Sequence, residues 1–408
     1  MITVLCNTRI FDGSSADLLE GASIVIEDER IREVARGTPT FRDARVIDCR
    51  GRVALPGLID AHFHAYTPSF DIACIERMPA SLLASHARVL LEGALERGFT
   101  TVRDAAGADI GLWMAIEAGL IKGPRLLFSG KAISQTGGHG DMRPAADEVP
   151  CGCGHSSRMI ALVDGVDEMR RAVREELRKG ARQIKLFLSG GVISPTDPIW
   201  MPQLTQEEIR AAVYEASTRR TYVMAHCHTD DAARRCVEYG VRSIEHGSQI
   251  SDDTARLIAA QGVFVVPTLS IADVMRQHGS TLGAPPAMLE KIKWFGDTAL
   301  RAIEACMRAG VRIGLGTDLV DQVFHQQQGG ELALRGEVSP PIEVLRSATS
   351  VNAELLQMAG EIGCIRPGAF ADVLVVNGDP FADLGLFRQP QINIPLVMKG
   401  GVCVRNAL

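Results

Sequence analysis

Leu55-Pro-Gly-Leu-Ile-Asp-Ala-His-Phe-His64 is an apolar run that breaks at a Pro-Gly pair, resumes, and ends in two histidines two residues apart. Positions i and i+2 of a β-strand point to the same face of a sheet. His62 and His64 can therefore direct two imidazole rings at one metal ion. A His-x-His pair on its own is a weak signal, so its interpretation depends on what the rest of the chain places beside it.

Apolar, strand-like runs of this kind recur through the middle of the chain, and each is followed by an amphipathic helical pattern. Eight runs can be counted, at residues 58–64, 100–105, 125–130, 183–189, 222–226, 242–246, 263–269 and 312–318. The stretch after the fourth run includes Thr205-Gln-Glu-Glu208, a capping-box pattern that predicts the start of a helix. Eight β/α repeats predict an α/β fold of the (β/α)8, or TIM-barrel, type, with its functional groups at the carboxyl ends of the strands.

Residues able to bind metal or react fall at the ends of these runs. They are His62 and His64 on the first run, Lys185 on the fourth, His226 on the fifth, His246 on the sixth and Asp318 on the eighth. A random scatter of ionisable residues would rarely be placed this way, so the sequence predicts a catalytic metal centre at the barrel mouth. The alternatives are a buried core lysine at position 185 and a helix N-cap at position 318.

Both ends of the chain have a different character, with short segments rich in β-branched residues between glycines and aspartates. We expect residues 1–55 and 365–408 to form one small β-sandwich module built from both termini. Residues 56–364 would then form the barrel. The Arg103-Asp104 pair at the end of the second run is expected to be an ion pair that supports the barrel mouth.

The composition is that of an ordinary globular protein: 408 residues, 46% hydrophobic and 23% charged. The 43 basic and 49 acidic residues give a net charge of −6, which offers no basic surface for nucleic acid or an anionic membrane. We find neither a secretory signal nor an apolar run of the roughly 18–20 residues that span a bilayer. Cys74, Cys227 and Cys306 lie in apolar runs, as reduced thiols do. We therefore expect a cytoplasmic protein, and the sequence leaves a homo-oligomer open.

The types of residue at the strand ends indicate which metal chemistry the site could support. Neutral imidazole and carboxylate suit zinc and similar divalent ions, and a set without cysteine favours an open, reactive site. The amine of Lys185 can react with CO₂ to give a carbamate, which can bridge two ions about 3.5–4 Å apart. Asp318 can bind one ion, take the proton of an attacking water and deliver it to a departing amine.

The longest irregular connection follows the third run and spans Ser134 to His155, and a loop of this length on the catalytic face favours substrate binding. Within it, His139 either contacts the substrate or hydrogen-bonds within the loop. His228, two residues after His226, is either functional or a satisfied histidine beside the site. His325 could contact the substrate, and Cys151, Cys153 and His155 form a cluster that resembles part of a structural zinc site.

With these residues in place, the chain resembles the amidohydrolase superfamily, whose metal centre has this strand-by-strand distribution of ligands. The resemblance covers nearly the whole chain. It is closest at Ser129-Gly-Lys-Ala-Ile-Ser-Gln-Thr-Gly-Gly-His-Gly-Asp141, Ser189-Gly-Gly-Val-Ile-Ser-Pro-Thr-Asp-Pro198 and Arg242-Ser-Ile-Glu-His-Gly247. These segments are similar to the imidazolonepropionase-related branch that contains Xaa-Pro dipeptidases (prolidases) and related metallo-dipeptidases.

The resemblance implies a binuclear centre with two divalent ions, zinc first among them. One ion would be held by His62, His64 and Asp318 and the other by His226 and His246, with carbamylated Lys185 as the bridge. Members that use one metal usually lack the lysine on strand four, so Lys185 argues against imidazolone hydrolysis. The implied reaction is cleavage of an amide or peptide bond by a metal-bridging hydroxide, with Asp318 as general base and acid.

The implied substrate is small and carries a carboxylate, and an Xaa-Pro dipeptide is the first expectation. The related dipeptidases usually carry a tyrosine two residues after the strand-five ligand, where this chain has His228. A histidine can still donate a hydrogen bond to a developing oxyanion. The alternative substrate is an N-acyl amino acid or an aromatic amide of the ochratoxin kind. A remote alternative is a barrel kept as a non-catalytic scaffold, against which the complete ligand set argues.

Overall fold

The computed structural model describes residues 1–143, 145–146, 157–194, 196–281 and 286–408. All eight predicted barrel strands are present in it. They are β6 (Leu58–Phe63), β7 (Phe99–Asp104), β8 (Arg125–Phe128), β11 (Ile184–Phe187), β12 (Val223–Cys227), β13 (Ser243–His246), β14 (Phe264–Val266) and β15 (Arg312–Ile313). Neighbouring strands pair in parallel within β6-β7-β8 and within β11 to β15. Main-chain hydrogen bonds from Ala61 to Leu315 and from Arg182 to Phe128 join the two groups, so the predicted barrel is confirmed.

Two further short strands, β9 (Ala132–Ser134) and β10 (Ile160–Leu162), flank the predicted long connection after β8. They pair in parallel with each other, and β9 also contacts β11. These strands fix the two ends of the connection beside the barrel. The predicted cluster of Cys151, Cys153 and His155 lies outside the described residues.

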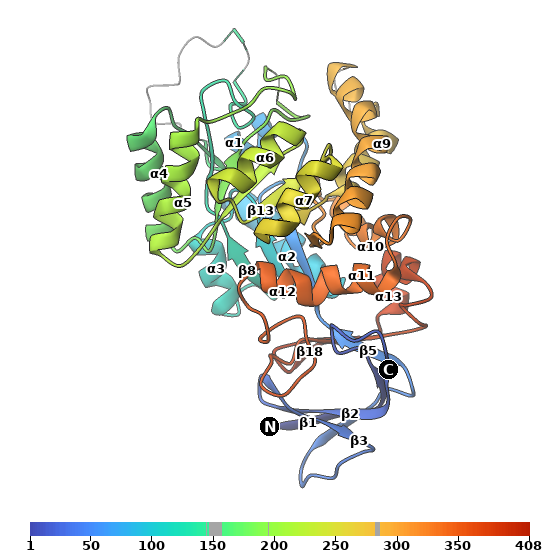
Figure 1. Cartoon of the computed structure of the whole chain (residues 1–408). Helices are drawn as coiled ribbons and strands as arrows, with labels where there is room; N and C mark the ends of the chain where they lie inside the picture. Colours follow the sequence, from blue (N-terminus) through green and yellow to red (C-terminus); the bar gives the residue numbers. More distant parts are fainter. Residues whose placement is uncertain (144, 147–156, 195, 282–285) are drawn as a thin grey trace.

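Helices surround the barrel, as Figure 1 shows. They are α1 (Ile72–Arg77), α2 (Ala80–Glu96), α3 (Ile110–Glu117), α4 (Val166–Arg178), α5 (Gln206–Thr218), α6 (Asp230–Tyr239), α7 (Asp252–Gln261), α8 (Leu269–His278), α9 (Pro286–Ala309), α10 (Gly330–Arg335), α11 (Pro341–Arg346), α12 (Asn352–Leu355) and α13 (Pro390–Asn393). The predicted capping box is present, because Thr205 and Glu208 each bond the other's main-chain N–H at the start of α5. None of the helices among the described residues is long and apolar enough to cross a membrane.

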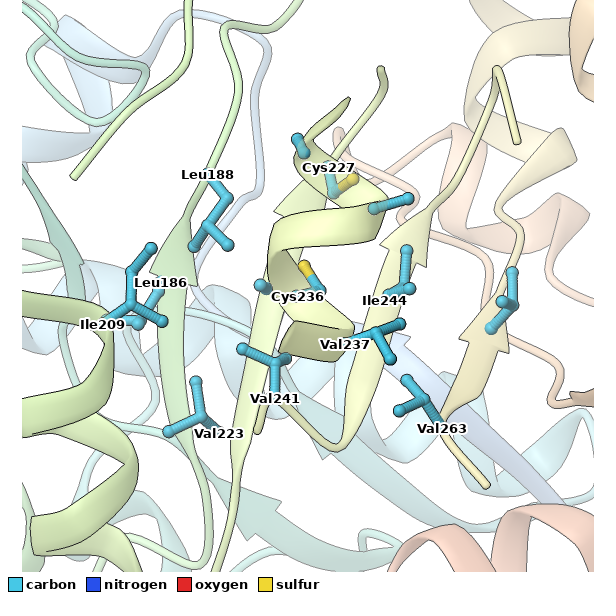
Figure 2. Close-up of a cluster of buried hydrophobic side chains, with 14 of the residues drawn as sticks. Leu186, Leu188, Ile209, Val223, Cys227, Cys236, Val237, Val241, Ile244 and Val263 are labelled. Carbon is cyan, nitrogen blue, oxygen red and sulfur yellow. The ribbon is translucent and has the colours of Figure 1, made fainter. Parts of the chain in front are cut away.

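The largest core lies between the barrel strands and the helices that cover them. Leu186, Val223 and Ile244 are fully buried on neighbouring strands, and Figure 2 shows Leu186 beside Ile209 from α5 and Ile244 beside Val237 from α6. Each such side chain contributes roughly 1.5–3 kcal/mol by leaving water. The eight cysteines that the structure describes are free thiols, and most of them are buried, in line with the sequence. This packing holds the strands rigidly, so their carboxyl ends provide a fixed platform.

The two ends of the chain meet in one mixed sheet of eight strands. The strands are β1 (Ile2–Ile10), β2 (Leu19–Glu27), β3 (Arg30–Arg36), β4 (Arg45–Asp48), β5 (Val53–Pro56), β16 (Val373–Val376), β17 (Leu396–Lys399) and β18 (Val402–Asn406). A β-sandwich was expected, but β5 pairs with both β1 and β16 and thereby connects all the strands into one sheet. Figure 1 shows this module below the barrel, with both termini on it.

Candidate metal centre

The six residues predicted from the strand ends all line one cavity at the mouth of the barrel, which has a volume of about 1040 Å³. They are His62, His64, Lys185, His226, His246 and Asp318. His139 and His228 line the same cavity. The structure therefore brings together every residue in the predicted set, from strands that lie up to about 250 residues apart in the chain.

Two groups within this set have ligand atoms that lie within 4.8 Å of one another. One group is His62, His246 and Asp318, and the other is His226, His228 and His246. His246 belongs to both groups, so the two lie side by side. An arrangement of this kind can hold divalent ions, and imidazole with carboxylate is a donor set that fits zinc.

Asp318 lies closest to the first histidine pair. Its Oδ1 atom is 3.0 Å from Nε2 of His64 and 3.4 Å from Nε2 of His62. Burial alone would raise the pKa of Asp318, but the neighbouring His62 and His64 rings outweigh it and lower the pKa to about 2. The carboxylate is therefore ionised at neutral pH, as a metal ligand or a proton acceptor must be.

The histidines are oriented by hydrogen bonds on their outer sides. Nδ1 of His62 lies 2.7 Å from a Glu245 carboxylate oxygen, and Nδ1 of His246 lies 2.7 Å from the hydroxyl of Thr268. Nε2 of His226 lies 3.2 Å from the carbonyl oxygen of Gly190. An imidazole held in this way keeps a fixed orientation and offers its other nitrogen to a cation.

The protonation states of these rings also suit metal binding. Burial is the largest influence on His62 and lowers its pKa to about 4. Burial likewise lowers the pKa values of His226 and His246 well below the usual range. All three rings are therefore neutral near pH 7, which is the form that binds a metal. The residues present thus fit the divalent ions that the sequence predicts.

Lys185 lies on β11 with only 2% of its surface exposed. Burial lowers its pKa to about 8, against the opposing influence of the Glu245 and Asp318 carboxylates. A substantial neutral fraction of this amine is thus present near pH 8. The neutral amine is the form that reacts with CO₂, so the surroundings favour the predicted carbamate.

Two of the candidate ligands have left-handed backbone conformations. His246 has φ +71° and Asp318 has φ +54°, and such conformations are uncommon in residues other than glycine. Residues with such backbone conformations concentrate at functional sites, where the contacts around them hold the unfavourable conformation in place. The alternative role of Asp318 as a helix N-cap finds no support, because the next helical segment, η1 (Phe324–Gln327), has Val323 at its N-cap.

The Gly-Leu-Gly-Thr-Asp segment brings Asp318 against β6. The main-chain N–H of Asp318 donates to the carbonyl oxygen of His62 at 2.8 Å. A Cβ atom on Gly316 would lie only 2.6 Å from Cβ of His62. Glycine at position 316 therefore permits the close approach that places the carboxylate beside the histidines.

His139 lines the cavity, and its ring is held by residues of the loop after β11 rather than by its own loop, while its contact with a substrate stays a prediction. Its Nδ1 atom lies 2.6 Å from the hydroxyl of Ser194 and 3.5 Å from a carboxylate oxygen of Asp197. Its ring stacks on His226 with the ring centres 4.3 Å apart. Gly191 packs against the ring, and a Cβ atom there would lie 2.1 Å from it.

Lys291 is a residue of this site that the sequence did not reveal. Its ammonium on α9 donates to the main-chain carbonyl oxygens of Gly191, Ser194 and Asp197 at 3.0, 3.5 and 3.1 Å. The loop after β11 is thereby tied to α9. One lysine within a long amphipathic helix has no distinguishing pattern, so only the three-dimensional arrangement identifies it.

Two interpretations of the sequence need correction. Arg103 does not pair with Asp104 but with the carboxylate of Glu245, 2.8 Å away inside the barrel. Asp104 instead accepts main-chain N–H groups, including that of Ala65 at 2.7 Å. His325 is buried, 4.9 Å from the ring of Phe63, and is not among the described residues that line the cavity. The prediction that Arg103 pairs with Asp104 was wrong because adjacent residues of a strand point to opposite faces of the sheet, which keeps their side chains apart.

Comparisons with known proteins agree with this geometry. A family model described as the amidohydrolase family matches residues 53–404. Ochratoxinase of Aspergillus niger is 33% identical over 372 residues, which cover 86% of this chain and 75% of that protein.

Two solved structures are similar over the full length of both chains. A prolidase complexed with N-methylphosphonate-L-proline superposes with a TM-score of 0.96 at 43% identity, and each chain is covered to 100%. An Xaa-Pro dipeptidase with methionine bound in its active site superposes with a TM-score of 0.89 at 29% identity, again with 100% of each chain covered.

Proposed function

The chain belongs to the amidohydrolase family, and we propose that it is a binuclear metallohydrolase that cleaves an amide bond in a small carboxylate-bearing substrate. Xaa-Pro dipeptides are the first candidates. One observation carries the proposal: four buried or nearly buried histidines, an ionised aspartate and a buried lysine converge on one cavity at the barrel mouth. The similarity to a prolidase and to an Xaa-Pro dipeptidase supports the choice of substrate.

In this proposal two divalent ions are held by the six strand-end residues. His62, His64 and Asp318 would hold one ion and His226 and His246 the other, and carbamylated Lys185 would contribute a carboxylate to both. When bound, such ions supply a reactive water at neutral pH and polarise the carbonyl of the scissile amide. The neutral rings of His62, His226 and His246 and the ionised carboxylate of Asp318 are the protonation states that this arrangement needs. Burial lowers the pKa of His64, but the Asp318 carboxylate outweighs it and raises that pKa, so the His64 ring would release its proton when an ion binds.

Asp318 is the proton carrier of the proposal. Its carboxylate lies beside His62 and His64 and has a pKa of about 2, so it is ionised at neutral pH and available as an acceptor. It takes the proton from the attacking water and passes it to the nitrogen of the departing amine, which cannot leave as an anion. The strained backbone at Asp318 holds the carboxylate in this position.

His139 and His228 are proposed to contact the substrate. Nδ1 of His139 is engaged by Ser194, so a substrate carboxylate or carbonyl would meet the other side of the ring. His228 lines the cavity with its Nδ1 atom 3.0 Å from the hydroxyl of Ser248. A neutral imidazole in this position can donate a hydrogen bond to the oxyanion that forms as the amide carbonyl is attacked.

A second candidate function is hydrolysis of an N-acyl amino acid or an aromatic amide. Three observations favour it: the 33% identity to ochratoxinase, the presence of His228 where dipeptidases usually have tyrosine, and the size of the cavity. About 1040 Å³ lies at the upper end of the roughly 300–1,000 Å³ typical of ligand pockets. Apolar side chains including Met159, Phe187 and Met275 line it, as a bulky aromatic group would require.

Turnover of a library tests the proposal and separates the two candidates. The protein is prepared with measured metal content and assayed against Xaa-Pro dipeptides, other dipeptides and N-acyl aromatic amino acids. We expect hydrolysis of a carboxylate-bearing amide, fastest for Xaa-Pro, whereas a preference for N-acyl aromatic substrates would favour the second candidate. A preparation with two metal equivalents that hydrolyses none of these amides would contradict both.

A further inference from the structure

A buried ion pair lies inside the barrel next to the candidate ligands. Arg103 on β7 and Glu245 on β13 have fully buried side chains, and an Arg103 terminal nitrogen lies 2.8 and 2.9 Å from the two Glu245 oxygens. The sequence marks neither residue as a ligand or a catalytic group, and neither is one of the described residues that line the cavity. The pair therefore has no direct access to a substrate.

The position of Arg103 is fixed by further contacts. Its Nε atom donates to the main-chain carbonyl of Ala61, and another guanidinium nitrogen lies 3.1 Å from the hydroxyl of Ser243. Ser243 also bonds Glu245. Arg103 thus links the strand that carries His62 to the strand that carries His246, and it holds the Glu245 carboxylate between them. This geometry leaves Glu245 little freedom to rotate.

Glu245 in turn contacts a candidate metal ligand. Its second carboxylate oxygen lies 2.7 Å from Nδ1 of His62, whose side chain is 1% exposed. An ionised carboxylate only accepts hydrogen bonds, so the proton of the neutral His62 ring resides on Nδ1. Nε2 then carries the lone pair, and this is the nitrogen that lies 3.4 Å from Asp318.

From this chain of contacts we infer that Glu245, held by Arg103, is a positioning residue that sets the tautomer and orientation of His62 for metal binding. The inference rests on the proposed function, because it assigns the ion pair to the ligand set of that site. Removing an outer partner of a ligating histidine typically weakens metal affinity by about 10–100-fold. A buried ion pair generally adds little to stability compared with apolar residues of similar volume, so a role in the metal centre accounts for its presence.

The test measures metal affinity rather than activity alone. Metal-free wild-type protein and Glu245→Gln are titrated with zinc in competition with a chelator. Glutamine keeps the shape of glutamate but lacks the charge that holds both Arg103 and the His62 proton. We expect one of two zinc equivalents to bind roughly 10–100-fold more weakly in the variant. The other equivalent should bind within about threefold of wild type, and activity should return as zinc is raised.

The chain offers a matched control. Arg125 and Asp372 form another ion pair, 2.8 Å apart and with Asp372 2% exposed, outside the described cavity lining. Asp372→Asn should lower the thermal midpoint but leave both zinc affinities unchanged. A comparable loss of zinc affinity in this control would assign the effect of Glu245→Gln to general destabilisation and overturn the inference.

A double variant covers the case in which Glu245→Gln does not fold. Arg103→Met combined with Glu245→Leu removes both charges and leaves neither one buried alone. We expect this protein to fold and to show the same weakened zinc equivalent. Wild-type zinc affinity in either folded variant would overturn the inference. Failure of the wild-type protein itself to bind zinc or another divalent ion would instead contradict the proposed function.

Discussion

The ammonium group of Lys291 lies 3.0 Å from the main-chain carbonyl oxygen of Gly191, so a side chain on α9 holds the loop against which His139 packs. The next residue on α9, Ile292, lines the cavity. Lys291 therefore fixes two walls of the cavity relative to each other.

Replacement of this lysine should weaken catalysis without loss of the fold. Lys291→Met removes one half-buried charged donor that three carbonyl groups share, at a net cost of roughly 1.5–3 kcal/mol in all. We expect kcat/KM to fall by about 10–100-fold. The thermal midpoint should change only slightly, and Lys291→Arg should restore part of the activity. Lys122→Met, at an exposed position, is the control. Steady-state kinetics equal to wild type in Lys291→Met would show that the loop keeps its position unaided.

The ring of His139 can be tested from two sides. His139→Ala should lower kcat/KM by roughly 10–10³-fold with unchanged metal content, the scale of losing one strong donor to the transition state. Gly191→Ala leaves the histidine in place, but its new Cβ atom would lie 2.1 Å from the ring and displace it. We expect a similar loss of activity. Gly330→Ala, whose Cβ would meet nothing within 4 Å, should be neutral. Full activity in both site variants would assign His139 to loop structure.

Asp318→Asn tests the proton carrier. Asparagine keeps the shape and one oxygen ligand but cannot accept the proton, so we expect kcat to fall by at least about 10³-fold. Circular dichroism should be unchanged. Because the pKa of Asp318 is about 2 without metals, its protonation limits activity only at acidic pH, and any residual activity of the variant should lack that acidic limb. More than a tenth of wild-type kcat with metals bound would place the base elsewhere, with His228 first to be examined.

Metal removal and pH together test the carbamate. Protein stripped of metal should be inactive, and zinc with bicarbonate should restore activity with about two equivalents bound. The amine of Lys185 has a pKa of about 8 and reacts only when neutral. At constant dissolved CO₂, restoration should therefore be roughly 50-fold faster at pH 8 than at pH 6, as the neutral fraction dictates. A stable, active protein with one metal and an unmodified lysine would contradict the binuclear proposal.

The sequence predicted the barrel and the positions of its reactive residues because both depend on local patterns. Apolar runs of strand length alternate with amphipathic helices, and His62, His64 and Asp318 stand at the ends of such runs. The strand-end rule then places them at one mouth of the barrel without knowledge of any contact.

The supporting contacts could not be predicted in the same way. Lys291 and Glu245 lie on ordinary elements, and their partners, Gly191 and His62, are 100 and 183 residues away along the chain. Such pairs depend on the direction of side chains inside a closed barrel, which periodicity does not give. The sequence gives one weak indication of a role for Glu245, because a carboxylate directly before a ligand-type histidine on a buried strand needs a buried partner.

The place of β5 between β1 and β16 has a consequence for synthesis of the protein. A ribosome adds about 5–20 residues per second, so the stretch that separates β5 from β16 emerges over tens of seconds. During that time β1 can already pair with β5, but the edge of β5 that faces β16 stays open. An open strand edge can pair with another chain. The sheet therefore closes only when β16 has been synthesised, after all eight barrel strands have left the ribosome.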